Sequence, residues 1–191
     1  MPQTSTAPTE SSVVITTETL EKAARLARDL HSPLWISHSG EQSSGESVAR
    51  HLDAAGVLLG TVGWTRTWTK PSPGRLPLPD AGASAEDMLR MLLAYLREED
   101  EELRSDGPLT AVDALAHIDG TEHGDTDTRS IALEVLTLLV RALTGQADAH
   151  FAPWEARLHR THADITVILA AGARFARTYG PGAPHSGPSA D

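Results

Sequence analysis

The residues with the clearest chemical potential lie between positions 117 and 127, where two histidines and four acids fall within eleven residues. Imidazole and carboxylate groups are ligands for zinc, manganese and iron, and a loop between two helices can fold around an ion. This segment is therefore a candidate divalent-metal site. Its candidate ligands are His117, Asp119, His123 and Asp125.

The spacing within this loop matches no established metal motif. The HExxH pattern is absent, and an EF-hand loop that began at Asp125 would have Arg129 and Leu136 at two of its ligand positions. The other interpretation is a polar loop between two helices, in which Asp127 serves as the N-cap of the second helix. The sequence leaves both interpretations open.

Glu155 and His159 form a second candidate because they are four residues apart and would share one helix face. A carboxylate beside an imidazole is the raw material of general base catalysis, but the same spacing also describes an ordinary surface pair. The chain has no GxSxG, GxGxxG or Walker A pattern and no cysteine. We therefore assign no catalytic or cofactor-binding residue, and the sequence favours a protein that is not an enzyme.

The negative charge is concentrated in one segment. Residues 86–127 contain 13 acids and three arginines, which accounts for the whole net charge of −10. Such a surface repels phosphate backbones and attracts basic partners. We therefore expect a protein partner that binds the acidic segment 86–127, whereas nucleic acid is disfavoured. One exception is a set of basic residues near the C-terminal helix, which could contact nucleic acid: Arg157, Arg160, Arg174 and Arg177.

The elements that would position these residues are mostly helices. Apolar residues recur at helical spacing in five or six segments, and residues 127–144 are apolar on nearly all sides. The fold class is therefore predicted as mainly α, an irregular bundle of five or six helices around a central apolar helix at 127–144. The alternation of Val62, Trp64, Arg66 and Trp68 with threonines predicts a small β-hairpin near 61–69.

The boundaries of the chain are predicted from composition. Residues 1–12 and 180–191 are poor in large apolar residues and are expected to be disordered tails, which leaves a single helical domain at 13–179. There is no apolar run long enough to span a bilayer and no signal peptide, so we expect a cytoplasmic protein without a membrane partner. Nothing in the sequence sets an oligomeric state.

Several short matches in the region 46–178 carry a family resemblance: Gly63-Trp64, Ala132-Leu133-Glu134-Val135, Trp154, Arg160-Thr161, and the double alanine at 170–171. In these residues the chain resembles a domain of unknown function found in short actinobacterial and actinophage proteins. The chain has Glu155-Ala156 after Trp154, where the family typically has Asn-Asp, and it lacks the cysteine often found in the middle. The resemblance implies a helical fold and an actinobacterial source, and it implies no activity.

Overall fold

The computed structural model describes residues 12–67, 84–103 and 107–183, and these residues form seven helices. The prediction of a mainly helical protein is confirmed. The helices are α1 (Thr17–Arg28), α2 (Gly45–Val62), α3 (Ala85–Leu103), α4 (Ala111–Ile118), α5 (Thr126–Thr144), α6 (Phe151–Glu155) and α7 (His162–Tyr179). None of the helices in the described residues is both long and apolar enough to cross a membrane.

The chain divides into two compact units. Residues 1–67 and 108–191 form the first unit, which contains every helix except α3, and residues 68–107 form the second unit. The single domain predicted over 13–179 stays a prediction.

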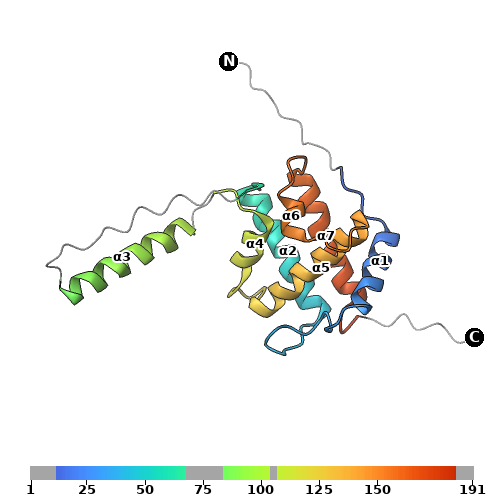
Figure 1. Ribbon diagram of the computed structural model, residues 1–191, viewed down its shortest axis with the longest axis horizontal. Coiled ribbons are helices and arrows are strands. Elements are labelled where there is room, and N and C mark those ends of the chain that lie inside the picture. Colours follow the sequence, from blue (N-terminus) through green and yellow to red (C-terminus); the bar gives the residue numbers. More distant parts are fainter. Residues whose placement is uncertain (1–11, 68–83, 104–106, 184–191) are drawn as a thin grey trace, which may run out of the picture. The chain divides into compact units, whose positions relative to one another are not determined.

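Helix α5 is the centre of the first unit. It contacts α1, α2, α4, α6 and α7, and α2 and α7 also pack closely against each other (Figure 1). Val135, Leu136, Leu139 and Val140 of α5 are fully buried. A helix that contacts neighbours on most sides must be apolar on most sides, which is why residues 127–144 lack a continuous polar face.

Helices α2 and α7 approach each other most closely where α2 begins and α7 ends. A side chain on Gly45 would collide with the backbone of Ala176 and Gly180, and a side chain on Gly180 would collide with Gly45. The amide of Gly45 also donates a hydrogen bond to the carbonyl of Pro181. Glycine is therefore required on both sides of this crossing.

The hairpin predicted near 61–69 does not form in its described part, residues 61–67. Thr61 and Val62 complete the last turn of α2, and Gly63 ends the helix with a positive φ of 90°. Trp64 then pairs with Leu109 in an isolated parallel bridge. The alternating pattern arose because a helix end and a short extended segment adjoin here. Residues 68 and 69 lie outside the described residues.

The N-caps agree only in part with what the sequence patterns predict. Thr110 and Thr161 cap α4 and α7, and each is followed three residues later by an aspartate, which is the sequence pattern typical of such a cap. Helix α5, however, is capped by Asp125, whose side chain accepts a hydrogen bond from the Thr128 amide, and not by Asp127. The pattern Ser43-x-x-Glu46 is typical of an N-cap at Ser43, but Ser44 is the residue that caps α2.

The helix face that Glu155 and His159 were expected to share is absent, because the short helix α6 begins at Phe151 and ends at Glu155. Pro153 is tolerated within its first turn, where a backbone donor is not needed. Of the predicted tails, residues 1–11 and 184–191 lie outside the described residues. Ser12 donates hydrogen bonds to the buried Asp164 carboxylate, and Gly180 is packed against Gly45.

Candidate functional site

The four predicted metal ligands occupy separate positions around the turn between α4 and α5. His117 is exposed in the last turn of α4, and His123 is exposed beside Glu122. Asp119 forms an ion pair with Arg129 at 2.8 Å, while Asp125 is committed to capping α5. Among the residues that the structure describes, no three histidine or acid side chains converge in an arrangement that could hold a metal ion.

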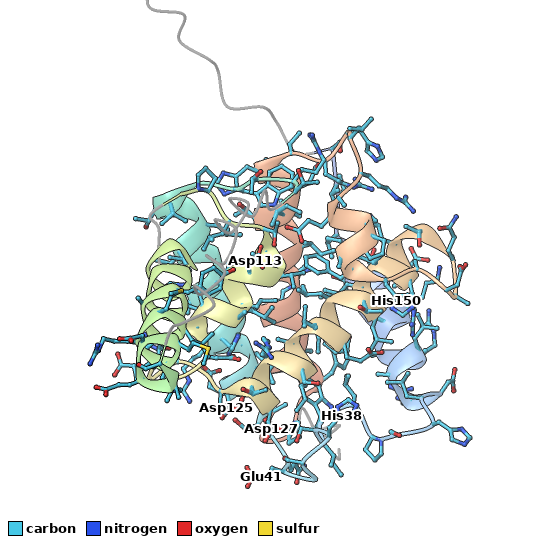
Figure 2. All side chains as sticks on the ribbon, turned by 60° about the vertical axis from the view of Figure 1, so that its left-hand side comes forward. His38, Glu41, Asp113, Asp125, Asp127 and His150 are labelled. Carbon is cyan, nitrogen blue, oxygen red and sulfur yellow. The ribbon has the colours of Figure 1, made fainter. Side chains whose placement is uncertain are left out.

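A polar pocket of about 450 Å³ lies between this turn and the start of α2. Figure 2 shows Asp125, Asp127, His38 and Glu41 gathered at this end of the bundle, away from Asp113 and His150. The carboxylates that line the pocket are those of Glu41, Glu122, Asp125 and Asp127, and its arginine is Arg50. The surplus of carboxylates gives the pocket a negative potential, which disfavours anionic ligands.

His51 lies beneath this pocket and has no exposed surface. Its Nε2 is 3.0 Å from the carbonyl oxygen of Leu115, and because a carbonyl only accepts, Nε2 carries the hydrogen. Nδ1 lies against Gly124 and has no hydrogen-bond partner among the described residues. Burial lowers the pKa of His51, although the hydrogen bond to Leu115 and the charges of Asp119 and Asp125 oppose this effect. The ring is therefore neutral at pH 7.

The burial of His51 could have been predicted from the sequence. His51 lies three residues after Val48 and four before Ala55, and both residues belong to the apolar stripe of α2. A histidine on such a stripe is expected to be buried. The two histidines of the 117–127 loop, in contrast, lie on the surface.

Glu155 is buried at the end of α6 and joins three segments of the chain. One of its oxygens, Oε1, accepts hydrogen bonds from Trp64 Nε1 at 2.8 Å and from the backbone amide of Ala111 at 2.5 Å. Burial raises the pKa of Glu155, and these hydrogen bonds limit the rise. The predicted pair with His159 does not form, since α6 ends at Glu155 and His159 is exposed.

Two arginines pack around the same end of the bundle. The guanidinium of Arg160 lies over the ring of Trp154, with 4.0 Å between its Cζ and the ring centroid. Arg66 Nη2 donates a hydrogen bond to the carbonyl of Arg160. Trp154 is almost completely buried, so these contacts serve packing and cation–π stabilisation.

The C-terminal arginines do not form one basic surface. Arg160 precedes α7, whereas Arg174 and Arg177 lie near its end, on the order of 20 Å away along the helix axis. Arg177 is paired with Glu46 at 3.0 Å and with Asp53 at 2.7 Å. These two carboxylates therefore offset the positive charge of Arg177, which binding to a phosphate backbone would require.

Helix α3 exposes large apolar residues. Met88 and Leu92 are each 44% exposed, Leu93 is 53% exposed and Leu89 is 60% exposed. Their spacing of three and four residues places them on one face of the helix. Arg90 is paired within the helix with Glu86 and Asp87. The second unit thus presents an apolar strip on an acidic helix.

Residues 43–175 match the model of a family of unknown function, DUF6197. The match covers more than half of the chain. The chain belongs to the DUF6197 family. No curated protein and no solved structure shows a significant match to it.

The DUF6197 match runs from the residues before α2 to Phe175 in α7, so α1 lies outside it. Trp64, Trp154 and Arg160, which carried the family resemblance in the sequence, meet around the Glu155 end of the bundle. Their contacts hold helices together. In this DUF6197 protein, the residues of the resemblance therefore have an evident structural role.

Proposed function

We propose that this DUF6197 protein is a non-enzymatic interaction module that binds another protein through its acidic segment, residues 86–127. Helix α3 is the element that inserts into the partner. The partner is a protein with an apolar groove whose rim carries lysine or arginine side chains. In this mode of recognition, an amphipathic helix lays its apolar face into a groove.

The exposure of the apolar strip on α3 carries this proposal. Leu89, Leu92 and Leu93 are each at least 44% exposed and share a face. Large apolar patches on a protein surface mark sites of interaction, whereas single exposed leucines do not. A groove that covered the strip would remove its leucine side chains from water, which is the main source of affinity in such complexes.

The charge of α3 defines the chemistry of the groove. The helix contains seven acids and two arginines, with five of the acids in its second half. An acidic flank beside an apolar strip speeds association with a basic rim and opposes binding to an acidic one. Because surface charges are screened by salt, binding weakens as ionic strength rises.

Site-specific photo-crosslinking in cells that produce the protein naturally tests this proposal. A benzophenone side chain at the exposed Ala94 of α3 is expected to give one discrete cross-linked protein. The control position is Leu158, which is 86% exposed in the first unit. Equal products from both positions, or no discrete product from Ala94, would rule out α3 as the binding element.

The captured protein must then bind the purified full chain directly. The double variant Leu89→Ala/Leu93→Ala keeps good helix formers and is expected to weaken binding by roughly tenfold or more. The matched variant Val57→Ala/Leu158→Ala removes two exposed apolar side chains elsewhere and is expected to leave the affinity unchanged. The proposal is overturned if neither the double substitution in α3 nor an increase in salt concentration changes the affinity.

The setting of the interaction belongs to the same proposal. We infer a cytoplasmic protein of an actinobacterium or actinophage, which the resemblance noted in the sequence supports. The excess of arginine over lysine, 14 against two, is typical of GC-rich genomes and points the same way.

A further inference from the structure

We propose that a pocket between α1 and the C-terminal end of α7 binds a small molecule with a flat aromatic body and one carboxylate group. The pocket has a volume of about 470 Å³, which lies within the range of small-molecule sites. Its lining shares no residue with the acidic pocket beside Asp125. The proposed small-molecule site is therefore an addition to the proposed function, and it does not depend on protein binding by α3.

The body of the ligand is defined by three aromatic side chains. Trp35 stacks on Phe175 with 6.3 Å between ring centroids and an angle of 19° between the planes, and Tyr179 lies 5.1 Å from Phe175. Ala24 and Ala27 of α1 form part of the remaining wall, and their small side chains leave space beside the rings. A flat ring fills such a space while keeping the stacking geometry that aromatic groups prefer.

The charge of the ligand follows from the polar groups of the pocket. The chain has 26 acids against 16 bases, yet none of the described residues that line this pocket is Asp or Glu. The lining includes Arg28 and His31. Arg28 has neither an ion pair nor a side-chain hydrogen bond to any other described residue, so its five N–H donors are available to a ligand.

Arg28 decides whether the pocket accepts a negatively charged ligand, because the C-terminal ends of two helices lie beside it. The pocket adjoins the last turns of α1 and α7, whose terminal carbonyls carry partial negative charge and repel anions. A guanidinium that forms two parallel hydrogen bonds with a carboxylate outweighs this repulsion. Without Arg28 the pocket would accept the aromatic body and reject the carboxylate.

The residues of this pocket also lie largely outside the family match. Residues 24–35 precede the matched region, and Phe175 is its last residue. The pocket is therefore built mainly by residues that precede the part of the chain matched by the family model.

Isothermal titration calorimetry on the full chain tests the proposal with 2-naphthoate and its uncharged counterpart 2-naphthamide as probes. We expect 2-naphthoate to bind at one site per chain and more tightly than the amide. The Arg28→Gln variant is expected to weaken 2-naphthoate binding by roughly tenfold or more and to leave the amide unaffected. Arg25→Gln, on the same helix but outside the pocket, should change neither.

A filling variant tests the location. Ala27→Leu places a larger side chain in the pocket and is expected to abolish binding of both probes, while Ala170→Leu on the exposed face of α7 leaves binding intact. The proposal is overturned by absence of one-to-one binding of 2-naphthoate at millimolar concentration, or by binding that ignores Ala27→Leu. Tighter binding of octanoate than of 2-naphthoate overturns the requirement for a flat body.

Discussion

Gly124 lies against the imidazole of His51 so closely that a methyl group on Gly124 would overlap Nδ1 and Cε1 of the ring. Gly124 belongs to the turn between α4 and α5, and His51 belongs to the middle of α2. The turn predicted as a candidate metal loop can thus pack against His51 only because residue 124 has no side chain. The first two predictions concern this contact.

Gly124→Ala is expected to destabilise the protein by about 1–3 kcal/mol, the usual cost of overpacking a closed contact. The measurement is the free energy of unfolding in urea. Gly56→Ala is the matched control, because Gly56 is within α2 with nothing within 4 Å of an added Cβ. That change should stabilise the protein by about 0.5–1 kcal/mol. Equal effects of the two substitutions would contradict the contact.

His51 is expected to make the folded state sensitive to mild acid. Its pKa is lowered by burial, so below the ordinary value of 6.5 the unfolded chain binds a proton that the folded chain does not. Stability therefore falls as the pH drops below 6.5, with a slope of up to about 1.4 kcal/mol per pH unit until the folded-state pKa is reached. Urea titrations of His51→Gln should lose this slope, whereas those of the exposed His117→Gln should keep it.

The start of α5 provides a test of the two interpretations of the 117–127 loop. Asp125→Ala removes the N-cap and is expected to cost about 0.5–2 kcal/mol, whereas Asp127→Ala, two residues further along, should cost less. If the acids serve as caps and ion pairs, EDTA leaves the melting temperature of the wild type unchanged. A drop in melting temperature on adding EDTA, restored by zinc or manganese, would favour the metal interpretation.

Removal of the Glu155 carboxylate is expected to be costly because two donors depend on it. Glu155→Ala leaves Trp64 Nε1 and the Ala111 amide without their acceptor, at about 1–3 kcal/mol for each buried group. Glu155→Gln keeps an acceptor oxygen and should cost less. Glu122→Ala serves as the exposed control, with a side chain 85% exposed and an expected change within about 0.5 kcal/mol.

Most of the helices could be predicted because their information is local. Apolar residues at helical spacing and the side chains of Thr110 and Thr161 place α4 and α7 to within a residue or two. The errors have local causes as well. Ser43 and Ser44 compete for one cap position, and Asp125 and Asp127 compete for another, so the choice depends on how the preceding turn packs.

The candidate sites could not be predicted in the same way, because they depend on contacts between distant segments. Trp64 and Glu155 are 91 positions apart, and no periodicity in either segment indicates that they meet. The pocket between α1 and α7 likewise combines Trp35, which precedes α2, with Phe175 of α7, far away along the chain. His51 is an intermediate case, since its burial follows from the stripe of α2 while its contact with Gly124 does not.

The isolated β-bridge between Trp64 and Leu109 affects which changes of sequence this protein can tolerate during evolution. Thr65 and Gly63 exchange backbone hydrogen bonds with Leu109, so the two points at which residues 68–107 leave and rejoin the first unit are fastened together. A stretch of chain whose ends are already joined can be shortened, exchanged or replaced by a brief turn at little cost to the scaffold. The segment that contains the acidic helix α3 can therefore be exchanged while the rest of the fold stays the same.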